Sequence, residues 1–156
     1  MKLKRKVPEE LIFKTFIEWD GERGGKALTG KSQSEIFFDT PKIFGGKGRY
    51  ACPDELFLAS LGGCLMNTFL YLAKNYVRYI KDFKIATECE IKLESDAYIV
   101  SNIRMNAKLI ALEKYAQAIK TFLEAAYEHC HLIQLVRKST NLELTVEIEK
   151  IKKNSF

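Results

Sequence analysis

The feature that most restricts how this chain can fold is an apolar run of 18 residues, Leu56–Ala73, which contains no charged side chain. A run of this length is close to the minimum for a membrane-spanning helix. Polar residues and a Gly-Gly pair dilute it, however, and without it the alternating strands elsewhere in the chain would lack an apolar partner. We therefore predict a helix buried on several sides of a globular protein, and no association with a membrane.

The residues at the start of this helix indicate where it begins, and two glycines inside it indicate where its backbone is closely approached. Pro53 suits a first helical turn, and Asp54 and Glu55 suit the positive end of the helix dipole. Gly62 and Gly63 each cost about 1 kcal/mol in a helix interior. We therefore expect a close approach to the helix backbone at this point, by a partner helix or by a ligand.

The rest of the chain alternates between strands and one further helix. Two glycine-rich segments, Gly21–Gly25 and Gly45–Gly48, predict a hairpin turn and a loop. Strands interrupted by helices indicate the α+β class with an antiparallel sheet, in one domain over residues 1–156. Because one sheet covers only one face of an all-apolar helix, we infer a homodimer. The predicted strands are Ile12–Trp19, Ser34–Phe38, Phe83–Leu93, Tyr98–Leu109 and Leu142–Ile148, and the second helix is Leu112–Tyr127, followed by a short turn over His131–Val136.

Charge and cysteine content narrow the functional classes. The net charge is +5, and no signal-peptide segment is recognisable, so we expect a cytoplasmic protein. Nucleic-acid binding is an alternative supported only by basic runs at the two ends, without an aromatic-interleaved RNA motif, and we expect no nucleic-acid partner. The basic residues of these ends are Lys2, Lys4, Arg5, Lys6, Lys150, Lys152 and Lys153.

The four cysteines form no CxxC pair, which disfavours a zinc ribbon or a disulfide-rich scaffold. Cys64 follows the two glycines of the apolar helix, and Cys130 lies just past the second helix. Each is either a small core residue or a reactive thiol. The run His129–Cys130–His131 also permits a metal site completed by Cys64 or Asp54, although adjacent ligands converge poorly on one ion and we expect neither metal nor cofactor.

Three segments carry a resemblance to a known family. The stretch Cys52–Cys64 resembles the first cysteine motif of the OsmC/Ohr family, with its proline, its acid, its Leu-rich run and two small residues before the cysteine. The stretch Ala126–Val136 is similar to the second cysteine motif, and Glu18–Gly21 to the first strand and turn. The resemblance therefore spans nearly the whole chain.

This resemblance implies both a fold and an activity. It implies an intertwined OsmC-like homodimer with its two main helices at the centre and active sites at the subunit interface. It also implies a thiol-dependent peroxidase that reduces organic hydroperoxides and, less uniformly, hydrogen peroxide, with a lipoyl or other dithiol as reductant. Cys64 would be the peroxidatic cysteine and Cys130 the resolving one, joined by a disulfide after each turnover.

The chain departs from the family pattern at three positions. Asp54 stands where the family has a glutamate. The activating arginine is best matched by Arg23, with Arg49 and Lys42 as alternatives, and His131 stands where a proline usually follows the second cysteine. These departures leave open a second hypothesis, an OsmC-fold protein that binds a small molecule or thiol without peroxidase turnover. Of the other cysteines, Cys89 is expected to be a packing residue and Cys52 to lie at the start of the helix.

Overall fold

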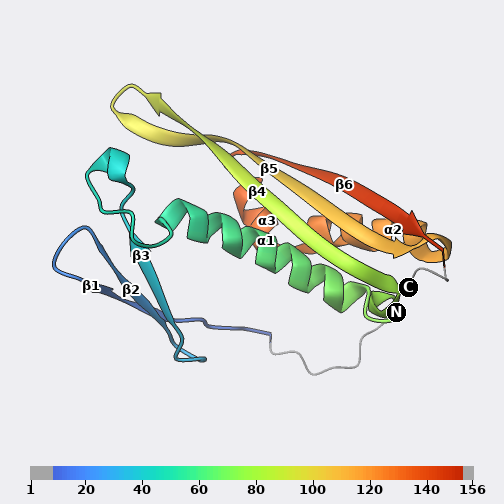
Figure 1. The fold of residues 1–156 in the computed structure, drawn as a ribbon. Coiled ribbons are helices and arrows are strands. Elements are labelled where there is room, and N and C mark those ends of the chain that lie inside the picture. The colour runs from blue at the N-terminus through green and yellow to red at the C-terminus, as the bar shows by residue number, and fades with distance from the viewer. Residues whose placement is uncertain (1–8, 153–156) are drawn as a thin grey trace. The chain divides into compact units, whose positions relative to one another are not determined.

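The computed structural model describes residues 9–152, which form an α+β chain as predicted (Figure 1). Its contacts divide it into two compact units, one up to Leu56 and the other from Phe57 onward. The basic residues at positions 2–6 and 153 lie outside the described range. Each unit is described separately below.

The first unit is built on a three-stranded antiparallel sheet in the order β1-β2-β3. Its strands are β1 (Thr15–Trp19), β2 (Gly24–Thr29) and β3 (Glu35–Asp39), followed by the 3-10 turn η1 (Lys42–Phe44). Strand β2 was missed in the sequence, because its two leading glycines suggest only a turn. They are needed in the strand, since a Cβ at Gly24 would lie 2.6 Å from the carbonyl oxygen of Phe38.

The second unit contains a three-stranded sheet in the order β4-β5-β6. Strands β4 (Ile80–Glu94) and β5 (Ala97–Leu112) form the predicted antiparallel hairpin, whose turn places Ser95 at a φ of +54°. Strand β6 (Asn141–Ile151) pairs with β5 in parallel, so the expectation of a wholly antiparallel sheet is wrong here. The connection from β5 to β6 runs through helices, and such a crossover returns the chain in the same direction.

Helices cover one face of this sheet (Figure 1). After α1 (Pro53–Leu72) and the 3-10 turn η2 (Val77–Tyr79), the chain forms the hairpin and then α2 (Glu113–His129) and α3 (His131–Val136). Alternate side chains of β5 point into the core beneath the helices, as expected from the two-residue period of a strand. The largest fully buried apolar side chains of the unit are Leu61, Leu65, Phe69, Ile103, Met105, Leu109, Ile119, Leu123 and Ile133.

Helix α1 is buried along one side only. The expected close approach to its backbone occurs at Gly62, where a Cβ would lie 3.3 Å from Cγ2 of Thr87 on β4. The element that approaches Gly62 is therefore a strand of the same chain, whereas a Cβ at Gly63 would meet no atom of the described chain within 4 Å. Large apolar side chains elsewhere on α1 are exposed, including Phe57 and Tyr71. By length and composition α1 meets the criteria for a membrane-crossing helix, as core helices of other proteins also do.

Candidate thiol site

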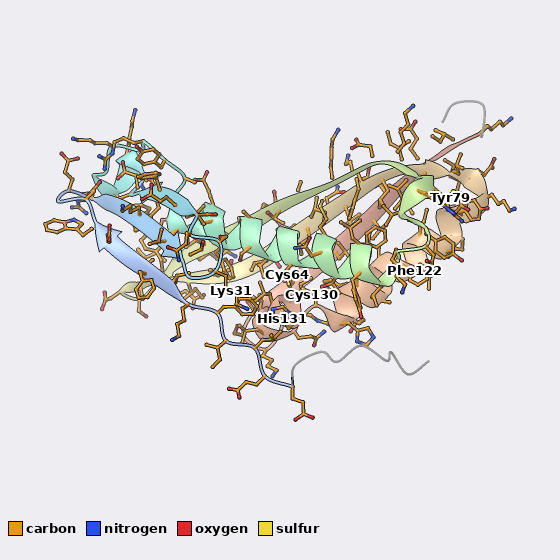
Figure 2. The ribbon with its side chains drawn as sticks, turned by 90° about the horizontal axis from the view of Figure 1, so that it is seen from below. Lys31, Cys64, Tyr79, Phe122, Cys130 and His131 are labelled. Carbon is orange, nitrogen blue, oxygen red and sulfur yellow. The ribbon has the colours of Figure 1, made fainter. Side chains whose placement is uncertain are left out.

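Two cysteines from different elements meet in the second unit (Figure 2). Cys64 lies in the middle of α1, and Cys130 is the single residue that separates α2 from α3. Their Sγ atoms are 3.2 Å apart, within hydrogen-bonding distance for two sulfur atoms. A disulfide needs a separation of about 2.0 Å, so the two atoms need to approach by only about 1.2 Å.

The break between α2 and α3 is what positions Cys130. Its backbone is extended, with φ −71° and ψ 115°, yet its N–H donates to the carbonyl of Ala126 and its own carbonyl accepts from the N–H of Gln134. One residue therefore ends one helix and begins the next with its backbone groups satisfied. The turn directs the Cys130 side chain inward, toward α1.

The two thiols differ in accessibility. Cys130 is 0% exposed, and Cys64 is half-buried. Cys64 therefore keeps part of its surface exposed to solvent, whereas Cys130 has none. Cys89, by contrast, packs on β4 against the hydrophobic core.

The surroundings of Cys64 act on its proton in opposite directions. Burial raises the pKa of the Cys64 thiol, and the neighbouring Cys130 adds to this effect, whereas the backbone N–H of Leu132 lowers the pKa. The imidazole Nδ1 of His131, the first residue of α3, lies 3.8 Å from the Cys64 sulfur. The groups that act on the Cys64 thiol are therefore the Cys130 sulfur, the His131 imidazole and two donors, the backbone N–H of Leu132 and the hydroxyl of Thr68.

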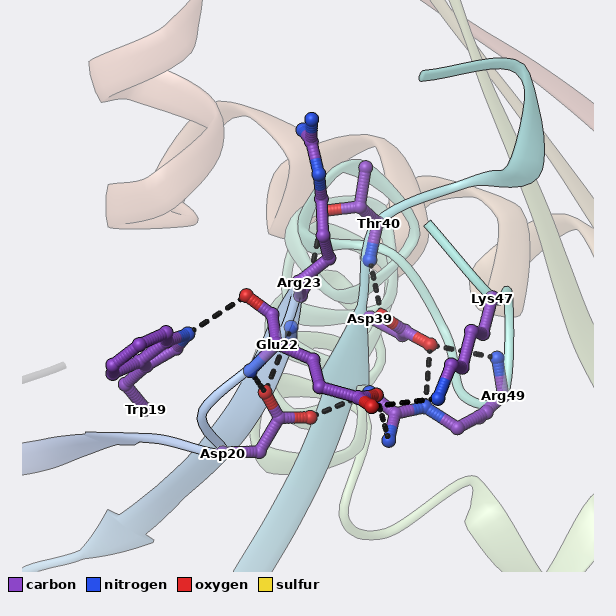
Figure 3. Close-up of polar contacts among 9 residues, drawn as sticks. Trp19, Asp20, Glu22, Arg23, Asp39, Thr40, Lys47 and Arg49 are labelled. Carbon is purple, nitrogen blue, oxygen red and sulfur yellow. Dashed lines mark hydrogen bonds and ion pairs between the residues drawn. The ribbon is translucent and has the colours of Figure 1, made fainter. Parts of the chain in front are cut away.

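Arg49, in the first unit, is held by acidic side chains (Figure 3). Its Nε donates to Asp39 at 2.8 Å, and its other nitrogens pair with Asp20 and Glu22. The side chain of Asp39 is buried, and hydrogen bonds from Arg49 lower its pKa to about 2. Asp39 and Asp20 in turn raise the pKa of Arg49. These contacts span 10 and 29 residues of sequence, so no local motif indicates them.

The other charged candidates in the first unit have different surroundings. The guanidinium of Arg23 points away from the carboxylates around Arg49 (Figure 3), and its backbone carbonyl accepts hydrogen bonds from Thr40. Arg23 forms no ion pair with the described part of the chain, and neither does Lys42. Among the cations proposed from the sequence, Arg23 and Lys42 are therefore available for another partner, whereas Arg49 is not.

Asp54 lies in the first turn of α1, as predicted. Its Oδ2 is 4.0 Å from the sulfur of Cys52, which precedes the helix. The backbone N–H of Cys52 donates to Oε2 of Glu55 at 2.7 Å, as in a capping box. Cys52 and Glu55 thus define the start of α1, and the carboxylate of Asp54 is not needed for that purpose.

The hypothesis of a metal bound around the His129–Cys130–His131 run gains no support. Over residues 9–152, no group of three or more His, Cys, Asp or Glu side chains is arranged to hold a metal ion. The ring of His131 faces Cys64, whereas His129, at the end of α2, bonds to neither sulfur atom.

Comparison with known proteins identifies a family that matches most of the chain. The family model described as OsmC-like protein matches residues 46–145, which include both cysteines. No curated protein matches the sequence.

Solved structures share the fold over most of the chain. A protein from Aquifex aeolicus is 24% identical, with a TM-score of 0.72, over 92% of this chain and 100% of its own. The OsmC organic hydroperoxide resistance protein from Legionella pneumophila is 18% identical, with a TM-score of 0.70, over 88% of this chain and 99% of its own. A putative organic hydroperoxide resistance protein from Vibrio cholerae, with captopril bound in one of its active sites, is 21% identical, with a TM-score of 0.68, over 91% of this chain and 96% of its own.

Proposed function

The chain belongs to the OsmC-like protein family, and from that premise we propose that it is a thiol-dependent peroxidase that reduces organic hydroperoxides. The observation that carries the proposal is the 3.2 Å separation of the Cys64 and Cys130 sulfur atoms. Structures of the same fold that are named organic hydroperoxide resistance proteins support the choice of substrate class.

The difference in accessibility supports separate roles for the two cysteines. A peroxidatic sulfur must meet a peroxide from solvent, and only the half-buried Cys64 satisfies that requirement. A resolving sulfur needs only to reach the first one, and the buried Cys130 is already in contact with it. We therefore assign the peroxidatic role to Cys64 and the resolving role to Cys130.

The reaction proceeds in three balanced steps. The Cys64 thiolate attacks the terminal peroxide oxygen, the O–O bond breaks, and the leaving alkoxide takes a proton to give the alcohol and a Cys64 sulfenic acid. The Cys130 thiol then displaces water from the sulfenic acid and forms the disulfide. A lipoyl or other dithiol reduces this disulfide by thiol–disulfide exchange and leaves as its own disulfide.

The proposal includes a cation that favours the thiolate, because burial of Cys64 opposes ionisation. We assign this role to Arg23, whose guanidinium is exposed and forms no ion pair with residues 9–152, in preference to Arg49, which is already bound by three acids. Asp54 would orient that cation, as the family glutamate is expected to do. Both assignments rest on the resemblance together with the contacts within the first unit.

We further propose that the protein works as a cytoplasmic homodimer. Leu70 and Tyr71 on α1 are 36% and 46% exposed, and Phe57 is 40% exposed. Large apolar side chains on one helix favour burial against another protein surface. A second copy of the chain would provide that cover, in keeping with the intertwined dimer implied by the resemblance.

Peroxide turnover by cysteine variants tests the proposal. With tert-butyl hydroperoxide and dihydrolipoamide, we expect Cys64→Ser to abolish consumption of the peroxide. In peroxide without the dithiol, Cys130→Ser should retain a dimedone-reactive sulfenic acid at Cys64, seen as a gain of about 16 Da before trapping, whereas the wild type should form the disulfide. Cys89→Ser, the matched control on β4, should retain the wild-type rate. Equal rates for Cys64→Ser and the wild type would remove the proposal.

The raised pKa of Cys64 favours one alternative, a protein of the same fold that binds a small molecule or thiol without turnover. Relatives from Vibrio cholerae and Elizabethkingia anophelis hold captopril and thiocyanate, respectively. This alternative predicts saturable thiol binding with both cysteines still reduced after exposure to peroxide. The assay above distinguishes the two, because only the peroxidase forms a Cys64–Cys130 disulfide.

A further inference from the structure

We propose that His131 is the acid–base partner of Cys64: its imidazole takes the thiol proton and returns it to the leaving alkoxide. Only the return of the proton to the alkoxide rests on the proposed function, because removal of the proton from the thiol can be measured without peroxide. His131 is one of the three positions at which this chain departs from the family pattern.

Geometry is the first support. His131 Nδ1 and Cys64 Sγ are 3.8 Å apart, within the range of a hydrogen bond that involves sulfur, and the two residues come from different elements that meet at the α2–α3 break (Figure 2). The imidazole is exposed, so its other nitrogen can exchange protons with water. Among the described residues of the second unit, His131 is the one basic side chain that contacts this sulfur atom.

The second support is the chemical need at the site. Burial raises the pKa of the Cys64 thiol, and Cys130 adds to this effect, so the thiol needs an acceptor for its proton. The guanidinium proposed above as the activating cation stays protonated and cannot accept that proton. An imidazole can, and the resulting imidazolium adds a positive charge beside the thiolate. Histidine is also the side chain whose charge changes most readily between about pH 5 and pH 8.

The groups around the imidazole are compatible with this role. The titratable group in contact with the ring is Cys64 from α1, and the sulfur of Cys64 in turn contacts Cys130 at the junction of α2 and α3. The nearest charges along the chain, Glu128 on α2 and Arg137 just after α3, are bonded to each other at 2.9 Å. No carboxylate is bonded to the His131 ring in residues 9–152, so the ring is not committed to a structural ion pair.

The protons and electrons balance over the step. The Cys64 proton moves to Nδ1, the thiolate sulfur forms a bond to the terminal peroxide oxygen, and the O–O bond breaks. The sulfur loses two electrons and the peroxide gains them. The alkoxide takes the proton from the imidazolium, which leaves a Cys64 sulfenic acid, an alcohol and a neutral His131.

The test is the pH dependence of Cys64 alkylation in the reduced, full-length protein, read from the mass of the peptide that contains Cys64. Iodoacetamide reacts with thiolates, so the rate follows the thiolate fraction. We expect His131→Gln to move the inflection upward by about one pH unit, which lowers the rate near neutrality by about tenfold. His129→Gln, a change of the only other histidine two residues away, should leave the profile unchanged.

Chemical rescue separates a proton-transfer role from a structural one. Free imidazole should restore much of the lost rate to His131→Ala, which a packing role would not allow. Identical profiles for His131→Gln and the wild type, or equal shifts for the two histidine variants, would overturn the inference. A shifted profile in a protein without peroxide turnover would retain His131 as the base and remove only the proposed function.

Discussion

Replacement of Phe69 by alanine should remove a large share of the stability of the second unit. Phe69 is 0% exposed on α1, and its ring meets that of Phe83 on β4 in an edge-to-face contact, with centroids 5.0 Å apart. Truncation of a buried phenylalanine costs about 3–5 kcal/mol, of which the aromatic pair accounts for about 1 kcal/mol. We therefore expect Phe69→Ala to lower the free energy of unfolding by about 4 kcal/mol.

Equilibrium unfolding in urea, followed by circular dichroism, measures this loss. With a slope of about 2 kcal/mol per molar urea for a chain of this size, 4 kcal/mol corresponds to a midpoint lower by about 2 M. Phe69→Leu keeps most of the buried apolar volume and should lose less than half as much. A double-mutant cycle with Phe83→Leu should give a coupling energy of about 1 kcal/mol.

The matched control is Leu135→Ala on α3, because that side chain is 64% exposed. Its truncation should cost about 0.5 kcal/mol or less. If Phe69→Ala and Leu135→Ala shifted the midpoint equally, Phe69 would not lie in the core and the placement of α1 against β4 would be wrong. Measurement at several protein concentrations separates unfolding from any dissociation of a dimer.

Three further predictions follow from the first unit and from the exposed face of α1. Arg49→Gln should lower the melting temperature, because it leaves the buried carboxylate of Asp39 without its main partner. Arg23→Gln should leave the melting temperature unchanged and should slow the consumption of peroxide. The pKa of Asp39 falls from 3.8 to about 2 on folding, so the stability that its carboxylate contributes is complete above about pH 4 and is lost as the pH falls through 2. Asp39→Asn should therefore make the melting temperature nearly independent of pH between about 4 and 2. The same pH dependence in the variant and the wild type would contradict the reasoning. Tyr71→Arg should shift the sedimentation coefficient toward that of the monomer without loss of the helical circular dichroism signal. A dimer that is unaffected by this change would show that the interface does not include this face of α1.

Most of the architecture follows from the sequence because hydrophobic periodicity is a local property. The alternation in Phe83–Leu93 and Tyr98–Leu109 corresponds to β4 and β5, and the apolar run of α1 is recognisable from its length alone. Two details did not follow from it. Strand β2 begins with glycines that look like a turn, and the parallel pairing of β6 depends on a crossover whose direction no local pattern encodes.

The sequence by itself also identified the two cysteines to which we assign the chemistry, because their motifs, 66 residues apart, can be read without coordinates. Only the tertiary structure decided how these groups are arranged. It brought the sulfur atoms to 3.2 Å, buried one and left the other accessible, and set the ring of His131 beside the accessible one. It also bound Arg49 to acids that lie far away along the chain. The physical reason is that contact distance, burial and ion pairing depend on the packing of distant segments, whereas a motif records only the order of residues along one segment.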